Sequence, residues 1–246
     1  MNFLELKNIS ERYLDLVNPT HPEKILTAGR VAGMKKDSRV IDFGCGYGEE
    51  LILWAKEFGI TGFGIDIRPA ACERAREKIK SQGLENRIEI ACGNAAEYEF
   101  QPQSFDIATC IGATFCWKDG FREAVREMQR AIKPGGRLVV GEAYWSHSDV
   151  PAEFAQRQPS ITAERELLRM ARAEGLELIY VLHSNHDDWD HYESENLRGL
   201  SDWLDENPMH PSRDEVIQHL HESQEEYLQY GREYFGWALY VLKPGT

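Results

Sequence analysis

The segment of this sequence best suited to chemistry lies between residues 40 and 50, where an apolar run leads into an acid and then into three alternating glycines. The apolar run predicts a strand that is buried on both faces. Glycine has no Cβ, so backbone amides in such a turn can approach a ligand closely. The residues from Glu49 onward predict a helix whose free N–H groups face the turn. Together these elements predict a cradle for a nucleotide.

The spacing of the glycines distinguishes between kinds of nucleotide. A dinucleotide fingerprint requires G-x-G-x-x-G, with the pyrophosphate on the helix N-terminus. Here Gly44, Gly46 and Gly48 alternate, and Glu49 stands where the third glycine belongs. The adjacent carboxylates of Glu49 and Glu50 suit the helix dipole but repel a phosphate. A nucleoside with a cationic centre and no phosphate, such as S-adenosyl-L-methionine (SAM), fits this pattern better.

A second acid follows at the end of the next predicted strand, residues 61–67. Asp66 lies 18 residues after Gly48, close to the position from which an acid accepts both hydroxyls of a ribose. An aspartate just before Pro69 can also simply open the next helix. In combination with the glycine loop, we predict the ribose role for Asp66.

The sequence resembles the class I SAM-dependent methyltransferases at several motifs in the correct order. Residues 42–48 match their first motif, D/E-x-G-x-G-x-G, and Gly93-Asn94-Ala95 stands where these enzymes carry G-D-A. A K-P-G-G step at Lys133 precedes the fifth predicted strand. An IGAT loop and a GE-x-YW strand end, at residues 111–114 and 141–145, narrow the resemblance to a bacterial group. This resemblance covers roughly residues 36–145 by motif and implies methyl transfer from SAM to a small-molecule acceptor by in-line displacement.

The same resemblance implies which residues bind SAM. Asn94 replaces the usual aspartate, and its amide can accept a hydrogen bond from the adenine amino group and donate one to N1. Cys110 and Ile111, at the end of the fourth strand, are implied to lie against the cofactor. The predicted cofactor-binding residues are Asp42, Gly44, Cys45, Gly46, Gly48, Asp66, Ile67, Asn94, Ala95, Cys110 and Ile111.

The fold implied by the resemblance is a Rossmann-like α/β fold with helices on both faces of a seven-stranded sheet. The sheet is expected to be mostly parallel, with the last strand antiparallel and lying between the fifth and the sixth. We predict one methyltransferase domain over residues 1–246. Residues 1–35 are predicted to form an N-terminal helical lid, and residues 183–233 a helical insert between strands six and seven that also caps the site.

Within the N-terminal segment the sequence predicts a short helix over residues 10–17. Thr20 and Glu23 fit a capping box that opens the helix after it. Two roles remain open for this segment. It either packs against the sheet edge or covers the ligand, with Tyr13 or Arg30 touching it.

Two candidates for a general base follow the fifth strand, because active sites of open α/β sheets lie beyond the carboxyl ends of the strands. They are Glu142 and His147. A base is required only if the acceptor must lose a proton. Glu142 could instead be a structural hydrogen-bond acceptor, and His147 an exposed loop residue.

Histidine and aspartate are concentrated between residues 183 and 191, which raises the question of a metal site. Their spacing matches no recognised ligand pattern. We therefore predict no metal and interpret the stretch as a solvated acidic turn before a helix.

The composition excludes several other classes of function. A net charge of −13 argues against nucleic acid and against an anionic membrane surface as partners. No apolar stretch approaches a membrane span, and the N-terminus does not resemble a signal peptide. Five irregularly spaced cysteines predict free thiols in a reducing, cytoplasmic compartment. Two alternatives to a methyltransferase remain, a non-catalytic SAM-binding protein and an NAD-dependent oxidoreductase.

Overall fold

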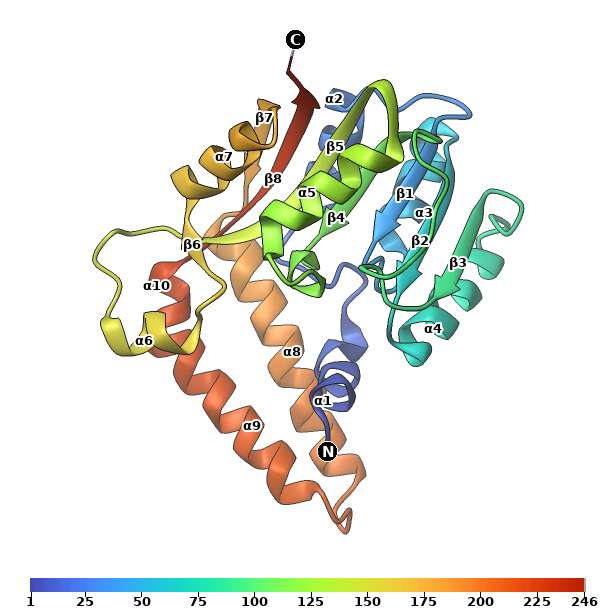
Figure 1. Ribbon diagram of the computed structural model, residues 1–246. Helices are drawn as coiled ribbons and strands as arrows, with labels where there is room; N and C mark the ends of the chain where they lie inside the picture. The colour runs from blue at the N-terminus through green and yellow to red at the C-terminus, as the bar shows by residue number, and fades with distance from the viewer. Residues whose placement is uncertain (246) are drawn as a thin grey trace.

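Seven long strands pair in the order β3-β2-β1-β4-β5-β8-β7 in the computed structural model, which describes residues 1–245 (Figure 1). The last strand, β8, runs antiparallel to both of its neighbours, β5 and β7. The strands are β1 (Arg39–Phe43), β2 (Thr61–Asp66), β3 (Ile88–Cys92), β4 (Phe105–Ile111), β5 (Ile132–Trp145), β7 (Leu176–His183) and β8 (Phe235–Pro244). This arrangement confirms the predicted Rossmann-like sheet and the position of its last strand.

Helices cover both faces of the sheet because successive side chains of each strand point to opposite sides and both sides are apolar. Val40 belongs to the core on one face, and its neighbour Ile41 to the core on the other. The first face is covered by α2 (Pro22–Val31), α3 (Glu49–Phe58) and α4 (Pro69–Ser81), and the second by α5 (Gly120–Ala131) and α7 (Glu164–Ala173).

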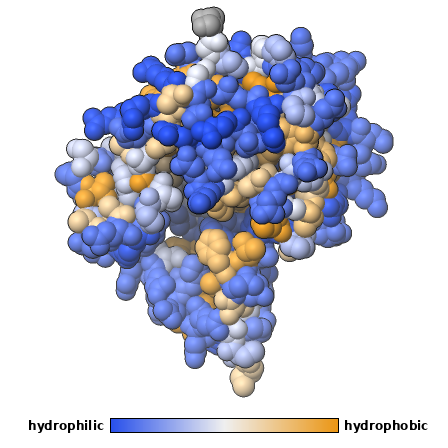
Figure 2. All heavy atoms as spheres, in the orientation of Figure 1, coloured by the Kyte–Doolittle hydropathy of each residue, from blue (hydrophilic) through white to orange (hydrophobic). Residues whose placement is uncertain are grey.

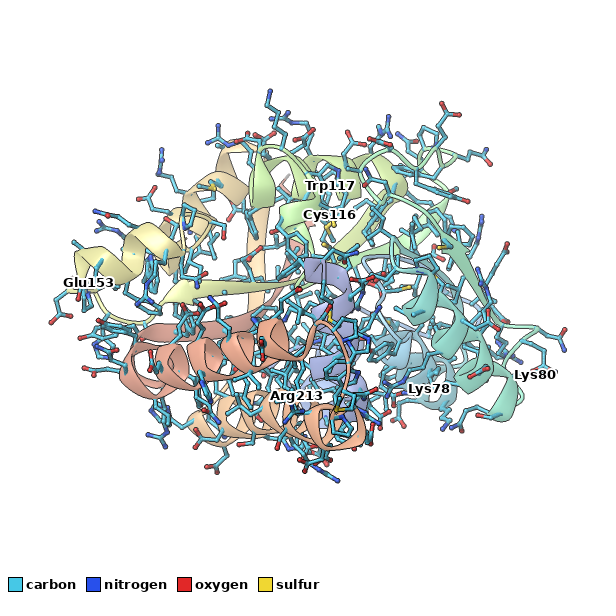
Figure 3. The ribbon with its side chains drawn as sticks, turned by 90° about the horizontal axis from the view of Figure 1, so that it is seen from below. Lys78, Lys80, Cys116, Trp117, Glu153 and Arg213 are labelled. Atoms are coloured by element: carbon cyan, nitrogen blue, oxygen red, sulfur yellow. The ribbon has the colours of Figure 1, made fainter. Side chains whose placement is uncertain are left out.

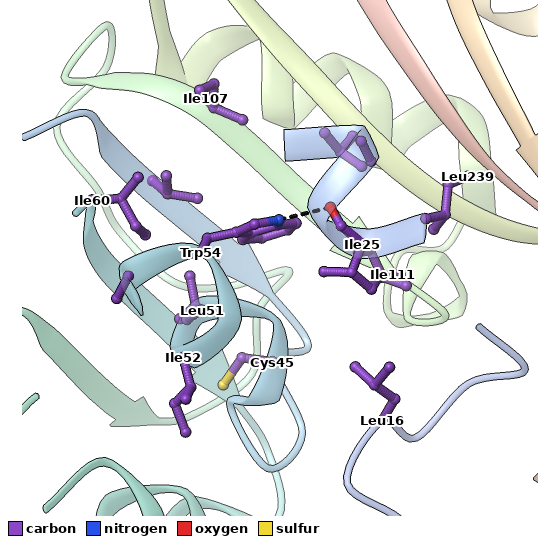
Figure 4. Close-up of a cluster of buried hydrophobic side chains, with 14 of the residues drawn as sticks. Leu16, Ile25, Cys45, Leu51, Ile52, Trp54, Ile60, Ile107, Ile111 and Leu239 are labelled. Carbon is purple, nitrogen blue, oxygen red and sulfur yellow. Dashed lines mark hydrogen bonds between the residues drawn. The ribbon is translucent and has the colours of Figure 1, made fainter. Parts of the chain in front are cut away.

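A buried tryptophan fixes α2 against α3 on the first face. Trp54 is fully buried, and its indole N–H donates to the carbonyl of Ile25 at 2.9 Å (Figure 4). An indole N–H buried among aliphatic side chains needs such a partner. The contact therefore holds the N-terminal segment to the helix that follows the glycine loop.

Two features near β5 differ from the prediction. A short strand, β6 (Thr162–Ala163), pairs with the end of β5, and a short helix, α6 (Ala152–Arg157), precedes it. The K-P-G-G step is a bulge within β5, because the pairing passes from Phe105–Ile132 directly to Ile107–Arg137. Gly135 takes a φ of +82° in this bulge.

The helical insert projects from the end of the sheet where the parallel strands terminate (Figure 1). It comprises α8 (His186–Glu206), α9 (Arg213–Glu226), a π-helical turn (Tyr227–Gly231) and α10 (Arg232–Tyr234). Arg213 at the start of α9 donates to the carbonyl of Leu204 in α8, which fixes the turn between the two helices (Figure 3). Helices were predicted in this region, with the second beginning near residue 212, and the structure confirms them.

The N-terminal segment differs from the prediction in two respects. Its helix is α1 (Phe3–Ser10), followed by a 3₁₀ turn (Glu11–Tyr13), so the helix predicted over residues 10–17 is wrong. Asn2 and Glu5 form the capping box that starts α1. The box predicted at Thr20 is also wrong: His21 is the N-cap of α2, and the Thr20 hydroxyl accepts a hydrogen bond from Trp237 instead.

Helix α1 packs along α8 at a glycine. A Cβ at Gly199 would lie 2.4 Å from the carbonyl oxygen of Ser10. The side chains of Leu6 and Ile9 join the small apolar cluster of the insert around Leu200. Thus α1 and the insert form one layer beyond the strand ends. None of the helices within residues 1–245 combines the length and apolarity needed to cross a bilayer.

Candidate active site

The loop between β1 and α3 has the backbone conformation that the alternating glycines predict. Gly44, Gly46 and Gly48 all have positive φ, of 77°, 51° and 72°, which is costly for any residue with a Cβ. The space beside two of them is filled by protein. A Cβ on Gly44 would lie 2.2 Å from Cβ of Ala113, and one on Gly46 would lie 2.7 Å from Val17. The glycines therefore serve loop geometry and packing as well as access for a ligand.

Asp66 lies directly beside this loop, because parallel pairing of β1 with β2 brings their carboxyl ends together. Its side chain is buried, and Oδ2 accepts a hydrogen bond from the amide of Gly46 at 2.9 Å. Oδ1 accepts one from the amide of Arg68 at 2.9 Å. A carboxylate oxygen can accept more than one hydrogen bond, so these contacts orient Asp66 without using its full capacity.

The two glutamates at the start of α3 do not act as the sequence suggested. Glu49 forms an ion pair with Lys78 of α4 at 2.6 Å (Figure 3). Glu50 is buried, accepts a hydrogen bond from Asn18 at 2.8 Å, and has a pKa raised above its usual range by burial. Their combined repulsion of a phosphate is therefore weaker than expected. Asp66 is the more direct barrier to a phosphate group. Its carboxylate already accepts the hydrogen bond of the Gly46 amide, which a pyrophosphate would otherwise accept.

A cavity of about 400 Å³ opens beside Asp66 and the glycine loop. It brings together six of the predicted cofactor residues: Gly44, Asp66, Ile67, Asn94, Ala95 and Ile111. The other five lie in the glycine loop or behind the cavity wall. Among these, Asp42 is buried and accepts a hydrogen bond from Thr109 at 2.6 Å, and Cys45 and Cys110 are buried in the two cores.

The N-terminal segment supplies the opposite wall of this cavity, with Phe3, Lys7, Glu11 and Val17. Glu11 is 4% exposed and binds the guanidinium of Arg68 at 2.6 Å. The Lys7 ammonium lies 3.4 Å from the same carboxylate. The buried ion pair of Glu11 with Arg68 therefore joins the N-terminal segment to the loop that follows Asp66.

Residues 40–136 match the family described as a methyltransferase domain. The chain is 31% identical over 248 residues to the uncharacterized protein YjhP of Escherichia coli, covering 98% of this chain and 99% of that one. It also resembles a crystal structure of a SAM-dependent methyltransferase from Geobacter sulfurreducens in complex with S-adenosyl-L-homocysteine (SAH). The TM-score is 0.89 at 29% identity, over 98% of both chains.

This chain belongs to the class I SAM-dependent methyltransferases. A SAM-dependent methyltransferase from Thiobacillus denitrificans, also solved with SAH, matches equally well, with a TM-score of 0.89 at 29% identity over 99% and 100% of the two chains. A shorter region, 43% of the present chain and 45% of the relative, is 36% identical to a demethylmenaquinone methyltransferase of Listeria monocytogenes. SAM is therefore the cofactor, and the nicotinamide alternative is set aside.

Asn94 in this methyltransferase lines the cavity, but its side chain also has a local role. Its Oδ1 accepts a hydrogen bond from the amide of Ala96 at 3.1 Å. This is the turn geometry that asparagine commonly adopts. The amide nitrogen remains as the group that can face an adenine.

Glu142 lies near the end of β5, next to the wall of the cavity. It accepts a hydrogen bond from the hydroxyl of Thr114 and one from the amide of Ala143 at 3.2 Å. Burial raises the pKa of Glu142 to about 7, while the Thr114 hydroxyl opposes this rise. A carboxylate that exchanges its proton near neutral pH has the property that a general base requires.

The structure does not bring His147 to the same place. Its imidazole is exposed and packs edge-on against the ring of Tyr234, with the centroids 5.9 Å apart. Tyr13 and Arg30, the two N-terminal candidates for ligand contact, also lie away from the cavity. The hydroxyl of Tyr13 donates to Asp202 at 2.8 Å, and Arg30 is exposed.

The side chains between residues 183 and 191 are used in separate local contacts. His183 binds Glu164 at 2.8 Å, Asp188 caps α8 and pairs with Lys24, and Asp190 binds Arg232. Within residues 1–245 no cluster of three or more His, Cys, Asp or Glu side chains is arranged to hold a metal ion.

Sequence reasoning missed several residues that shape the site. Val17 and Glu11 come from a segment whose helix was placed wrongly, and Tyr192 comes from the insert. Nothing in their local sequence indicates a site, because only the packing of α1 against α8 brings them to it. Thr114 could have been found, since it ends the IGAT loop that follows β4.

Proposed function

We propose that this methyltransferase transfers the methyl group of SAM to a small molecule, in the cytoplasm, and that nucleic acid and membranes are not its partners. The observation that carries the proposal is the cavity between the strand ends and the N-terminal segment, about 400 Å³ in volume. Such a volume suits a cofactor of low molecular mass. The net charge of −13 disfavours a polyphosphate partner. One relative, similar over 43% of this chain, is named for demethylmenaquinone, which is neither a nucleic acid nor a protein.

The residues of the cavity fit SAM in their chemistry. The buried carboxylate of Asp66 would accept hydrogen bonds from the ribose hydroxyls. Ile67 and Ala95 would pack on the adenine, and Asn94 would bind its polar edge. When bound, SAM supplies an electrophilic methyl group. Residues 1–35 and 183–233 would cover the bound ligands and exclude water, because α1 and Tyr192 line the cavity.

In this proposal the protein contributes mainly by positioning. Alignment of two reactants can supply on the order of 7–11 kcal/mol of rate acceleration. Glu142 would take a proton from the acceptor when the acceptor must lose one, with Thr114 holding its carboxylate in place. His147 is not assigned a part, because its imidazole is exposed and packs on Tyr234, whereas Glu142 is bonded to Thr114 in the loop that lines the cavity.

Two measurements test the proposal. Calorimetry should show binding of SAH and none of NAD. Incubation of the enzyme with methyl-labelled SAM and a metabolite extract should then place the label in a compound of low molecular mass. Label found in nucleic acid or in protein would overturn the small-molecule assignment, and tight binding of NAD would overturn the assignment of the pocket.

A further inference from the structure

A second cavity, of about 310 Å³, adjoins the cofactor cavity on the side of the helical insert. The two share Phe3, Lys7 and Tyr192, so α1 and the start of α8 form a common wall between them. Figure 2 shows a hollow on this face of the molecule between the sheet and the helical projection. A molecule in the second cavity would therefore be separated from the cofactor only by side chains of the N-terminal segment and the insert.

Two carboxylates line this second cavity, Glu193 on α8 and Glu226 at the end of α9. Glu193 has no ion pair or hydrogen bond with any other residue in the range 1–245. Glu226 accepts one hydrogen bond, from the amide of Gln158 at 2.9 Å. A partly buried carboxylate that lacks a protein partner is costly unless a ligand supplies one.

The positive charge of Lys7 offsets only part of the negative charge of these two carboxylates, although it lines the same cavity and attracts Glu193. Its ammonium lies 3.4 Å from Glu11, on the side of the cofactor cavity. Glu11 is shared with Arg68, which in turn contacts Asp66. These two basic and two acidic groups balance one another. Glu193 and Glu226 remain as an excess of negative charge that faces the second cavity.

An unpartnered amide in the cavity wall gives independent support. Asn196 is 8% exposed and lines the cavity. Its amide nitrogen donates to the carbonyl of Tyr192 at 2.8 Å, but its Oδ1 is sealed from solvent and accepts no hydrogen bond within residues 1–245. Buried polar atoms in native proteins are nearly always paired. Because this oxygen is sealed from the cavity, a donor on a bound molecule would reach it only after a small shift of the wall around Asn196.

Aromatic rings complete the wall. Tyr192, Tyr227 and Phe235 line the same cavity, and the hydroxyl of Tyr227 is already bound to Asp190 at 2.6 Å. Aromatic faces attract cations and pack against apolar groups. The second cavity therefore combines two carboxylates, the unpaired oxygen of Asn196 and three aromatic rings. This combination suits an amine with a small apolar body.

We infer that this second cavity binds the methyl acceptor, and that the acceptor is a small molecule that carries an amine. The inference rests on the proposed function, because it assigns the acceptor half of the same site. The amine would be recognised by Glu193, Glu226 and Asn196. Its path toward the cofactor would be framed by Phe3, Lys7 and Tyr192, or opened by their moving aside.

The reaction that follows is balanced within this site. The lone pair of the amine nitrogen forms the new N–C bond as the C–S bond of the sulfonium breaks, and the electron pair of that bond stays on sulfur, which gives SAH. The proton that the nitrogen sheds passes to a carboxylate. That carboxylate is Glu142, the base of the proposed function, which Thr114 holds in place and whose pKa burial raises to about 7.

The test measures binding to the enzyme saturated with SAH, so that no turnover occurs. Benzylamine and phenethylamine are compared with their neutral matches, benzyl alcohol and phenethyl alcohol, by calorimetry. We expect each amine to bind about tenfold or more tightly than its alcohol, as for a hydrogen bond to a charged group. Glu193→Gln should remove most of this preference, and Glu226→Gln part of it, while the Kd for SAH stays within twofold.

Glu225→Gln is the matched control, because Glu225 lies on the exposed side of α9 outside the cavity. It should leave the amine preference intact. Equal binding of amines and alcohols, or no binding of either amine while SAH binds normally, would overturn the inference and leave the methyltransferase proposal standing. Failure of SAH itself to bind would instead contradict the proposed function.

Discussion

The hydroxyl of Thr114 donates a hydrogen bond to the carboxylate of Glu142, and this bond joins the loop after β4 to the end of β5. Ala113 and Phe115, on either side of Thr114, both line the cofactor cavity. The bond therefore links the carboxylate with a raised pKa to the wall of the site. It also favours the ionised form of Glu142, since the hydroxyl stabilises the negative charge.

If Glu142 is the base, the rate of methyl transfer should depend on its ionisation. Its pKa is about 7, so the basic form decreases as the pH falls below 7. We expect kcat/KM to fall about tenfold per pH unit on the acidic side. Glu142→Gln should lower kcat by about 10²–10⁴-fold, with the Kd for SAH unchanged. The measurement is a pH–rate profile with the acceptor that the labelling assay identifies.

Thr114→Val separates a catalytic role of Glu142 from a structural one. Loss of the donor should raise the pKa of Glu142 and move the acidic limb of the profile upward by about one pH unit. Glu177→Gln, on β7 and away from the site, should leave the profile unchanged. A wild-type profile that is flat over about one pH unit on either side of the Glu142 pKa of about 7 would exclude Glu142 as the base.

Asp66 should contribute a large share of cofactor affinity, because its carboxylate is buried at the cavity wall. Asp66→Asn keeps an oxygen for the Gly46 amide but removes the charge. We expect the Kd for SAH to rise about tenfold or more. Asp106→Asn, which alters a surface ion pair with Lys133, is the control and should leave the Kd unchanged. An unchanged Kd in Asp66→Asn would remove the ribose role.

The part of the fold that could be predicted from the sequence is the part set by local signals. Apolar runs that end in Asp42 and Asp66, with glycines between them, specify buried parallel strands and the loop at their ends. Parallel pairing then places Asp66 beside Gly46 without further information. The order of the strands followed from the family resemblance.

What could not be predicted depends on contacts between distant segments. The position of Glu11 over Arg68 requires α1 to pack on α8, which is decided by the absence of a side chain at Gly199. Burial and the neighbouring Asp42 raise the pKa of Glu50, and the amide of Asn18 opposes this rise; the sequence alone does not reveal these contacts. The phosphate barrier was therefore assigned to the wrong carboxylates, although the conclusion about the nucleotide was correct.

The ion pair of Glu11 with Arg68 tests whether the N-terminal segment covers the cofactor. Glu11→Gln would leave a guanidinium with 11% side-chain exposure poorly paired, and breaking a buried pair typically costs about 3–5 kcal/mol. If the segment closes over the ligand, dissociation of SAH should accelerate about tenfold or more. Stopped-flow displacement of SAH measures this rate.

The matched control is Glu206→Gln, which removes the exposed pair with Arg12 on the same segment. Exposed pairs contribute about 0–1 kcal/mol, so dissociation should stay near the wild-type rate. A Glu11→Gln enzyme that is less stable but releases SAH at the wild-type rate would show that the pair serves folding and not closure.

The buried acids behind the glycine loop should make the protein less stable at higher pH. Asp42 and Glu50 are 2% and 5% exposed, and burial raises the pKa of both carboxyls above the usual range. The folded state therefore retains protons that the unfolded chain releases near pH 4. Stability from these protons is present at low pH and is lost as the pH rises from about 4 through about 8.

Other carboxylates act in a different pH range. Arginine side chains lower the pKa values of Glu174 and Asp190. The backbone amide of Arg39, followed by the side chain of Lys133, lowers the pKa of Asp106. Their stabilisation is lost only as the pH falls below the usual range of a carboxyl. Between about pH 5 and about pH 8 the buried acids should therefore dominate, because their raised pKa values lie in this range.

We therefore expect the free energy of unfolding in urea to be lower at about pH 8 than at about pH 5, by at least about 1.4 kcal/mol, the equivalent of one pKa unit. Glu50→Gln keeps an acceptor for Asn18 and removes the titration, so its stability should exceed that of the wild type at the higher pH. Glu57→Gln, on the exposed side of α3, should follow the wild type. A wild-type stability that rises over this range would show that Asp42 and Glu50 are ionised in the folded protein, and that the charge beneath the cofactor cavity is greater than their burial implies.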